Sequence, residues 1–340
     1  DPKTGLKAII AVHSTIMGPA VGGCRMWDYA SDEEALNDVL RLSRGMSYKN
    51  AMADLVLGGG KSVIIGNSKT LKTPELMRSF GRFINSVGGK YYSAEDVGIS
   101  VEDIEEAGKE TSFVAGLNKG KAASGDPSPY TAHGVFHGIK ASVKHKLGLE
   151  SVRGLKVGVQ GLGHVGSYLC EELHAEGAKL FVTDINDDAI INIVEKTSAT
   201  AVSTNEIMGL EVDVLAPCAL GAGLNSKTIP NLRTTIIAGA ANNQLAQDKH
   251  GVELIKRGIL YAPDYVINAG GIMNIANEIH GRAVSTAKGM KDVESIYNVL
   301  LEIYHKADTE GRPTGEISDE IARAKIKRIS QNRAQKTKAA

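Results

Sequence analysis

The fold is decided by the stretch Lys156-Val157-Gly158-Val159-Gln160-Gly161-Leu162-Gly163-His164-Val165-Gly166. Its first five residues are typical of a buried strand, and the next six fit the pattern G-x-G-x-x-G. A segment of helical character follows from Tyr168 to Glu176, and a second strand ends at Asp184. Strand, glycine turn, helix and acidic strand end are the parts of a dinucleotide-binding unit, so the stretch predicts a Rossmann-type domain.

Each part of this motif has a physical reason. Gly161 allows a tight turn, Gly163 lets the backbone approach a pyrophosphate, and Gly166 lets helix and strand pack closely. The helix N-terminus, at His164 and Val165, offers N–H groups and a positive dipole to the phosphates. Asp184 would accept hydrogen bonds from the ribose hydroxyls and would repel a 2′-phosphate, which favours NAD. The alternative is a glycine-rich turn that only packs.

The composition describes a globular chain of about two domains. It has 340 residues, 39 basic and 39 acidic side chains, and 42% hydrophobic residues. A chain of this length buries a large core without disulfide or metal support. The net charge of zero argues against a general nucleic-acid binder, because phosphate contacts require a basic excess. The longest uncharged run, residues 8–24, contains a proline and three glycines. We therefore expect no membrane span, and we expect no signal peptide.

The cysteines and histidines give no sign of a metal site. The three cysteines, Cys24, Cys170 and Cys218, are far apart, which argues against disulfides and favours a cytoplasmic protein. The histidines that we interpret as surface or satisfied core residues are His13, His133, His137, His164 and His280. We expect no bound metal.

Strand and helix signals alternate along the chain. The C-terminal strand candidates are residues 156–160, 179–183, 212–216, 235–238 and 259–262. This alternation predicts a parallel sheet covered by helices. The N-terminal third offers strands at residues 8–12, 63–65 and 91–94, with a break at Pro19, Gly22 and Gly23. Residues 118–129, rich in Gly, Ser, Lys and Pro, predict a hinge.

Gly58-Gly59-Gly60-Lys61-Ser62 suggests a phosphate loop at first. The pattern G-x-x-x-x-G-K-[ST] requires glycine at position 55, where the chain has Leu55, so we exclude a nucleoside triphosphatase. The glycines instead predict a backbone that passes close to a ligand, with Lys61 pointing into a cleft.

Three further polar residues are candidates for a site. Lys49 extends the apolar face of a helix, where an ammonium group either meets an anion or reaches water. Asp96 follows a strand candidate and is either a site residue or a turn cap. Asn268 precedes two glycines and either presents its amide to a ligand or caps a helix.

Six motifs, together with the dinucleotide fingerprint, carry a family resemblance. They are Gly18-Pro19-Ala20-x-Gly22-Gly23-x-Arg25-Met26, Gly45-Met46-x-Tyr48-Lys49-Asn50, Gly58-Gly59-Gly60-Lys61, Ala94-Glu95-Asp96-Val97-Gly98, Ala216-Pro217-Cys218-Ala219-Leu220-Gly221 and Ala262-Pro263-Asp264-Tyr265-Val266-Ile267-Asn268-Ala269-Gly270-Gly271. In this order, over nearly the whole chain, they resemble the glutamate/leucine/phenylalanine/valine dehydrogenase superfamily. Within it, the chain is most similar to the leucine dehydrogenases.

The resemblance implies an α/β fold of two domains with a cleft between them. A substrate domain would span residues 1–128, and a Rossmann-type NAD-binding domain would span residues 129–311. A C-terminal helix, at about residues 312–340, would return to the first domain. The family also implies a cytoplasmic homo-oligomer that handles small molecules and binds neither nucleic acid nor membrane.

The implied reaction is the reversible oxidative deamination of an L-amino acid to a 2-oxo acid and ammonia, with hydride passing to NAD. By motif, Lys61 corresponds to the catalytic lysine and Asp96 to the catalytic acid. Lys49 corresponds to the lysine that binds the substrate carboxylate, and Asn268 to an asparagine that holds the substrate. Substrate contacts are also expected at Gly22 and Gly23. Beyond the fingerprint, the residues expected at NAD are Thr131, Ala216, Cys218, Ala238 and Asn243.

The positions expected around the substrate side chain are Val21, Ala94, Ile272 and Ile275, all apolar. Glutamate is excluded because its second carboxylate would be buried unpaired. A branched aliphatic side chain fits, with leucine first and isoleucine and valine also accepted, since one methylene is worth only about 1–3 kcal/mol.

Three alternatives stay open at this stage. An aromatic amino acid dehydrogenase would share the fold. A non-catalytic NAD-binding regulatory module would need only the fingerprint and Asp184. An oxidative decarboxylase would also use lysine, aspartate and nicotinamide, together with a divalent metal.

Overall fold

The computed structural model describes residues 1–118, 123–219 and 221–339. Residues 119–122 of the predicted hinge and Leu220 of one family motif lie outside the described residues. The chain forms two units. Unit 1 comprises residues 1–126, 274–284 and the chain from residue 322 onward, and unit 2 comprises residues 127–273 and 285–321. The first boundary thus falls inside the predicted hinge, at residue 126 instead of 128, and residues 274–284 belong to unit 1.

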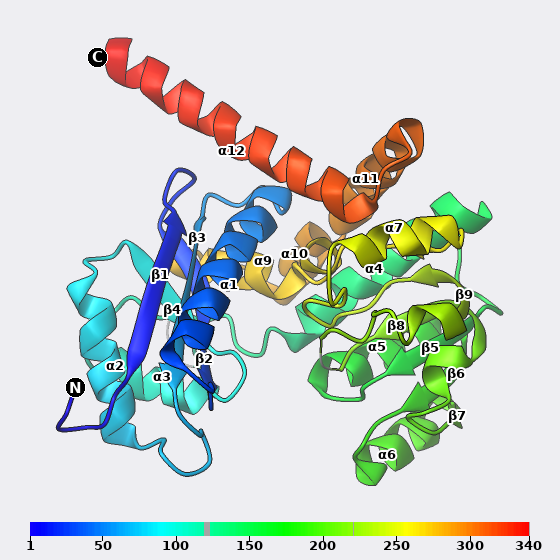
Figure 1. Cartoon of the computed structure of the whole chain (residues 1–340), viewed down its shortest axis with the longest axis horizontal. Coiled ribbons are helices and arrows are strands. Elements are labelled where there is room, and N and C mark those ends of the chain that lie inside the picture. Colours follow the sequence, from blue (N-terminus) through cyan, green and yellow to red (C-terminus); the bar gives the residue numbers. More distant parts are fainter. Residues whose placement is uncertain (119–122, 220, 340) are drawn as a thin grey trace. The chain divides into compact units, whose positions relative to one another are not determined.

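Unit 1 is built on a four-stranded sheet (Figure 1). Its elements are β1 (Ala8–Ser14), β2 (Ala20–Trp27), α1 (Asp32–Met52), β3 (Gly58–Ile65), α2 (Pro74–Ser86), β4 (Tyr91–Ala94) and α3 (Val101–Gly108). The strand order is β1-β3-β2-β4. β1 runs antiparallel to β3, whereas β2 is parallel to both of its neighbours.

Different helices cover the two faces of this sheet. On one face, Ile64 and Tyr91 join Phe80 of α2 in a buried cluster. On the other face, Val63 packs with Val39 of α1. Successive side chains of a strand point to opposite faces, so Lys61, two residues before Val63, lies on the α1 face. The register of β3 therefore decides where this ammonium group points.

β2 corrects the predicted break at Gly22 and Gly23, whereas Pro19 does lie in the break between β1 and β2. The strand runs through both glycines, because the backbone of neighbouring segments comes too close for a side chain. A Cβ at Gly22 would lie 1.9 Å from the carbonyl oxygen of Gly60, and one at Gly23 would lie 2.3 Å from that of Glu95. The glycines permit a close approach inside the sheet and do not interrupt it.

The three glycines before Lys61 lie inside β3. Gly58, Gly59 and Gly60 are its first three residues, and all are buried. A Cβ at Gly59 would lie 2.1 Å from the backbone nitrogen of Ser47 in α1, and one at Gly60 would lie 2.6 Å from the Tyr91 ring. The space that a side chain would occupy at Gly59 and Gly60 is filled by the protein itself, so these glycines permit close packing of β3, and the approach to a ligand stays a prediction.

Unit 2 contains a six-stranded parallel sheet in the order β10-β9-β8-β5-β6-β7. Its strands are β5 (Lys156–Gln160), β6 (Lys179–Thr183), β7 (Thr200–Ala201), β8 (Glu211–Pro217), β9 (Arg233–Ile237) and β10 (Leu260–Tyr261). Its helices are α4 (Ser128–Leu147), α5 (His164–Ala175), α6 (Asp187–Thr197), α7 (Lys249–Lys256), α8 (Asp264–Ile267), α10 (Thr286–Val293) and α11 (Ile296–Glu310), with short 3-10 turns at Ile207–Gly209 and Ile229–Asn231. The two remaining helices, α9 (Gly270–Ile279) and α12 (Thr314–Ala339), each contribute residues to both units.

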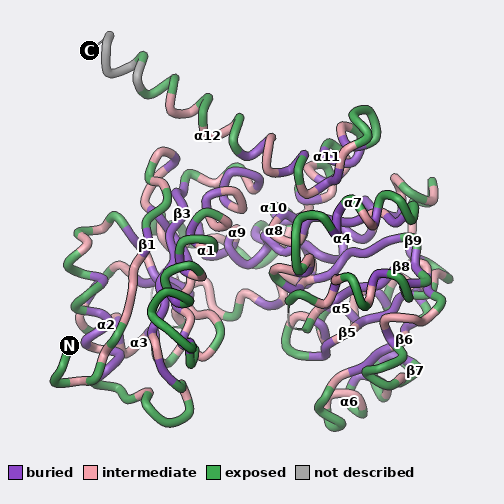
Figure 2. Tube along the Cα trace, viewed as in Figure 1, coloured by how far each residue is buried: buried purple, intermediate pink, exposed green. Residues whose placement is uncertain are grey.

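The core of unit 2 lies along its sheet. Leu215, Ile237 and Leu254 belong to one buried cluster, which packs α7 against β8 and β9. Figure 2 shows the strands of this sheet largely buried, with exposed residues on the helices. The predicted bounds of β5 and β6 are confirmed. α5 begins at His164, four residues earlier than expected, because Gly163 is its N-cap.

The C-terminal helix α12 begins in unit 2 and ends in unit 1. In unit 1, Lys325 of α12 donates to Asp54 at 2.7 Å, and the Arg323 guanidinium lies 6.0 Å from the Tyr48 ring. Among the described residues, no helix has both the length and the apolar content that a membrane crossing requires.

Candidate active site

A buried ion pair in unit 1 joins two of the predicted site residues. The Nζ atom of Lys61, on β3, donates to Oδ2 of Asp96 at 2.5 Å. Asp96 lies two residues beyond the end of β4. It is close to β2, because a Cβ added to Gly23 would lie 2.8 Å from the Cβ of Asp96. Only 8% of the Lys61 side chain and 17% of the Asp96 side chain are exposed. The strands β2, β3 and β4 thus bring together groups far apart in the sequence.

A second cation, Arg25 on β2, adjoins the same carboxylate. Its Nε lies 3.6 Å from Asp96 Oδ2, and its Nη1 donates to Asp38 of α1 at 3.0 Å. The Tyr29 hydroxyl donates to the same Asp38 oxygen at 2.8 Å. Sequence reasoning quoted Arg25 only as part of a motif and missed the other two residues. Side chains alternate between the two faces of β2, and this alternation, which places Arg25 on the α1 face, was the signal that could have identified Arg25.

These cations determine the charge state of Asp96. Burial alone would raise the pKa of the Asp96 carboxyl, because the charged form loses hydration. The neighbouring Lys61 ammonium and Arg25 guanidinium outweigh that effect and hold the pKa below its ordinary value. Asp96 is therefore a carboxylate at neutral pH and can accept a proton.

Lys49 lies in the last turn of α1 and is half-buried. Two positions of the preceding turn pack on the sheet: Ser47 against Gly59, and Met46 beside Gly22. Because residues three apart on a helix share a face, Lys49 follows Met46 toward the glycine-rich strands. The structure does not test its predicted contact with a substrate carboxylate.

Three of the predicted pocket residues belong to unit 1. Val21 and Ala94 are buried on β2 and β4, where β2 Gly23 pairs with Ala94. A Cβ built on Gly116 would lie 3.9 Å from both Ala94 Cβ and Ile275 Cδ1, so Ala94 and Ile275 flank the same point. The fourth residue, Ile272, is buried in unit 2.

In unit 2, most of the predicted cofactor residues follow the carboxyl ends of neighbouring strands. The Gly161–Gly166 turn follows β5, Asp184 follows β6, Ala216 and Cys218 lie at the end of β8, and Ala238 follows β9. β5 lies between β8 and β6, where the strand order reverses, and ligands of open parallel sheets bind at such a point.

The three glycines of the fingerprint differ in their surroundings. Gly161 has φ +99°, and a Cβ at Gly166 would lie 2.0 Å from the Gly161 carbonyl oxygen, so these two are required by the turn and by helix packing. A Cβ at Gly163, the N-cap of α5, would meet nothing within 4 Å. Open space at the N-terminus of a helix fits a pyrophosphate.

Asp184, the residue expected to bind the ribose of NAD, is held in place by two backbone N–H groups. Asp184 accepts from the backbone N–H of Leu162 at 2.5 Å and from that of Asn186 at 2.9 Å. A carboxylate has about four acceptor positions, so capacity remains for ribose hydroxyls. The residues of unit 2 therefore fit NAD.

The remaining predicted residues of unit 2 are fixed by local bonds. Asn268 is buried, and its Nδ2 donates to Ala240 O at 3.0 Å and to Asn242 Oδ1 at 2.7 Å. Thr131 donates to Pro127 O, and Asn243 has a left-handed backbone with φ +51°. The structure does not test their predicted contacts with substrate or NAD.

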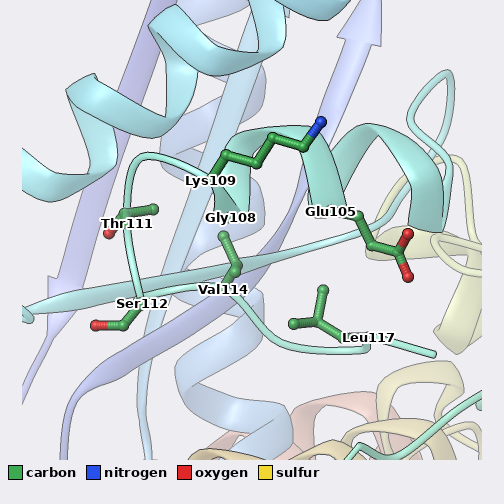
Figure 3. A pocket seen from close by; sticks show the side chains of 7 residues that line it. All are labelled: Glu105, Gly108, Lys109, Thr111, Ser112, Val114 and Leu117. Carbon is green, nitrogen blue, oxygen red and sulfur yellow. The ribbon is translucent and has the colours of Figure 1, made fainter. Parts of the chain in front are cut away.

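A separate surface depression of about 390 Å³ lies beside α3 (Figure 3). It is lined by Glu105, Gly108, Lys109, Thr111, Ser112, Val114 and Leu117. These lining residues include none of the predicted site residues, so the depression is not part of the candidate active site.

Two sequence profiles match the chain. Residues 2–113 match the profile described as Glu/Leu/Phe/Val dehydrogenase, dimerisation domain. Residues 179–335 match the profile described as Glutamate/Leucine/Phenylalanine/Valine dehydrogenase. The first match contains Lys49, Lys61 and Asp96, and the second contains Asp184 and Asn268.

Characterised relatives are similar over nearly the full chain. A leucine dehydrogenase of Bacillus cereus is 48% identical over 98% of this chain and 91% of its own length. A phenylalanine dehydrogenase of Bacillus thermotolerans is 47% identical, with coverage of 96% and 86%. The crystal structure of L-tryptophan dehydrogenase from Nostoc punctiforme superimposes with a TM-score of 0.84 at 44% identity, covering 96% of this chain and 94% of that one.

Proposed function

The chain belongs to the Glu/Leu/Phe/Val dehydrogenase family, and we propose that within it the protein deaminates branched-chain L-amino acids, leucine above all. As a family member, it is an NAD-dependent amino acid dehydrogenase. The proposed reaction converts an L-amino acid, water and NAD⁺ to a 2-oxo acid, ammonium, NADH and a proton. The observation that carries the chemistry is the Lys61–Asp96 pair with Arg25 beside it.

Asp96 is proposed to exchange protons with the substrate nitrogen. An amino acid arrives as an ammonium ion and must lose a proton before hydride can leave its α-carbon. Asp96 is ionised because Lys61 and Arg25 stabilise its negative charge, so its Oδ2 can accept that proton. After hydride transfer, the same carboxyl group returns a proton to the departing nitrogen.

Lys61 is proposed to activate the water that attacks the imino carbon. This role requires the Lys61 amine to be neutral when the water attacks, so that its Nζ can take the water's proton while Asp96 still holds the proton from the substrate. In its charged form, Lys61 stabilises the oxyanion that develops on the carbinolamine oxygen. The pair thus forms an acid–base couple on a buried sheet face.

Other residues are proposed to hold and orient the reactants. Lys49 supplies a fixed cation for the substrate α-carboxylate, and Asn268 helps to hold the substrate. The β5 turn and Asp184 would hold NAD, which would supply the hydride acceptor when bound. Val21, Ala94, Ile272 and Ile275 are proposed to line the side-chain pocket, where apolar surfaces exclude a second carboxylate.

A substrate panel tests this specificity. The measurement is kcat/KM for NADH formation with L-leucine, L-isoleucine, L-valine, L-phenylalanine, L-tryptophan and L-glutamate at alkaline pH. We expect leucine to be used best, with isoleucine and valine within about two orders of magnitude of it, because methylene differences are worth about 1–3 kcal/mol. Turnover with none of the three aliphatic substrates would reject the proposal.

An aromatic substrate is the second candidate. It is favoured by the relatives, since the phenylalanine and tryptophan dehydrogenases are nearly as similar to this chain as the leucine enzyme. Phenylalanine or tryptophan preferred over leucine in the same panel would establish it. Substituting Ala94→Gly would then improve turnover of the larger substrate further, because Ala94 Cβ and Ile275 Cδ1 flank the same point and removing the methyl group enlarges the space there.

We also propose that the protein forms homo-oligomers in the cytoplasm. The match of residues 2–113 to a dimerisation-domain profile supports self-association through unit 1. Light scattering coupled to size-exclusion chromatography tests this assembly, and a monomeric mass at micromolar concentration would contradict it. Fluorescence microscopy of the tagged full-length chain in the source cell tests the location.

A further inference from the structure

A cluster of two histidines and a glutamate lies in unit 2 and consists of residues that the proposed reaction does not use. His133 and His137 are four residues apart on α4, so they share one face of that helix. Their ring centroids are 4.6 Å apart. Glu294 immediately follows α10, and the ligand-type atoms of the three side chains all lie within 4.8 Å of one another. All three residues are half-buried.

His133 is oriented by a second carboxylate. Its Nδ1 donates to Glu172 Oε2 of α5 at 2.9 Å, which fixes the ring and turns Nε2 toward Glu294. That Nε2 is buried and has no hydrogen-bond partner among the described residues. The nearest carboxylate oxygen, Glu294 Oε1, is 4.0 Å away, which is too far for a hydrogen bond. A buried ring nitrogen without a partner requires an explanation.

Glu294 is also held in place. Its Oε2 accepts from Lys291 at 2.6 Å, and its Oε1 faces the His133 ring. A histidine that donates one ring N–H to a carboxylate while its other nitrogen faces further ligand groups has the arrangement of a metal-binding histidine. Here Glu172 takes the outer position, and His137 and Glu294 supply the additional ligands.

The geometry points to a binding site for a divalent transition-metal ion, Zn²⁺ by its preference for imidazole and carboxylate, with His133, His137 and Glu294 as ligands. Two histidines and one glutamate form a known three-ligand set for zinc, with water in a fourth position. Tetrahedral bonds of about 2.0–2.1 Å place ligand atoms about 3.4 Å apart, so the ligand atoms, which lie within 4.8 Å of one another, must close by no more than about 1.4 Å. Such a shift lies within the freedom of half-buried side chains.

This site departs from the sequence-based expectation of no metal. His133 and His137 have the four-residue spacing of helix-borne metal ligands, which sequence reasoning missed, and the third ligand, Glu294, is distant in the sequence and reaches α4 only through the packing of α10 on that helix. The interpretation of His133 as a satisfied or surface residue is wrong, since its Nε2 is buried and has no hydrogen-bond partner in the part of the chain that the structure describes.

Zinc titration of the full-length protein tests the proposal. After treatment with a chelator and buffer exchange, ZnCl₂ is titrated by isothermal calorimetry in a buffer that does not bind metals. Bound zinc is then counted by mass spectrometry of the gel-filtered protein. We expect a site of one Zn²⁺ per chain. Both His137→Gln and Glu294→Gln should weaken it by at least about tenfold, and Glu172→Gln should weaken it by roughly 10–100-fold through the orientation of His133.

The matched control is His174→Gln, which removes an exposed histidine from the neighbouring helix α5 and should leave the site unchanged. Circular dichroism and the melting temperature without metal establish that each variant is folded. ZnCl₂ should raise the melting temperature of the wild-type chain more than that of His137→Gln. Absence of stoichiometric zinc binding, or equal binding by His137→Gln and the wild type, would overturn the proposal. The zinc site does not depend on the proposed substrate. A negative deamination assay would therefore not count against the zinc site, and absence of zinc binding would not count against the proposed reaction.

Discussion

Substituting Asp96→Asn removes one charge from the buried ion pair and preserves the shape of the side chain. Lys61 then loses its 2.5 Å carboxylate partner. Arg25 keeps Asp38 at 3.0 Å, so Lys61 is the group left without a counter-ion. The substitution should therefore reduce both turnover and stability, and the stability loss measures the electrostatics of the site.

The expected magnitude follows from the burial of the pair. Removing one partner of a buried ion pair costs about 3–5 kcal/mol. With 8% and 17% of the two side chains exposed, the pair is nearly buried, and the introduced amide oxygen can still accept from Lys61. We therefore expect a loss near the lower limit, about 3 kcal/mol in the free energy of unfolding.

The stability loss should also depend on pH in a defined direction. The pKa of Asp96 in the folded state is held below its ordinary value by Lys61 and Arg25 in spite of burial. Stability from this group is therefore present above the unfolded pKa of about 3.9 and is lost as pH falls through the folded pKa. The difference between wild type and Asp96→Asn should shrink on acidification from pH 6 toward pH 3.

Urea unfolding at several pH values measures these quantities. The matched control is Glu171→Gln, which neutralises a carboxylate 2.6 Å from Lys196 in an exposed pair and should cost less than about 1 kcal/mol. If Asp96→Asn cost no more than this control, or if its effect grew in acid, the assignment of a buried, charged Lys61–Asp96 pair would be refuted.

Three further predictions concern packing and the cofactor turn. Gly23→Ala should abolish turnover, because the added Cβ would lie 2.8 Å from the Cβ of Asp96. Gly45→Ala is the control: a Cβ at Gly45 in α1 would meet nothing within 4 Å, and alanine favours the helix. It should raise the free energy of unfolding, measured in urea, by about 0.5–1 kcal/mol. Gly166→Ala should disrupt the turn after β5 and lower the melting temperature. Gly163→Ala should leave the melting temperature unchanged and weaken NAD binding measured by fluorescence. Equal melting temperatures for the two variants would contradict the packing role of Gly166 and the phosphate-binding role of Gly163. Tyr91→Phe should lower the free energy of unfolding by about 1–3 kcal/mol. The reason is that the buried Tyr91 hydroxyl forms hydrogen bonds with Gly22 O and Ser62 Oγ. An unchanged urea midpoint would argue against that network.

Much of the fold could be predicted because the signals are local. The apolar runs at Lys156–Gln160 and Lys179–Thr183 coincide with β5 and β6. The glycines of β2 misled sequence reasoning. Glycine usually signals a turn, but here it serves close backbone contacts, and those depend on neighbours remote in the sequence.

The site was predictable only in part for the same reason. Lys61 and Asp96 were singled out from motifs and strand ends, and the structure brings them together. The bonds of Arg25 to Asp38, and of Tyr29 to Asp38, depend on how α1 lies across β2. No spacing in the sequence encodes that placement, so this part of the electrostatic environment emerges only with the fold.

The central claim is that Lys61 takes part in the chemistry and is not needed to bind NAD. Its most direct test compares Lys61→Ala with the wild-type chain in two readouts: stopped-flow NADH formation from L-leucine, and NAD affinity by fluorescence titration. The account predicts that NADH formation is lost while NAD affinity is retained. NADH formation at a rate close to that of the wild type would contradict it.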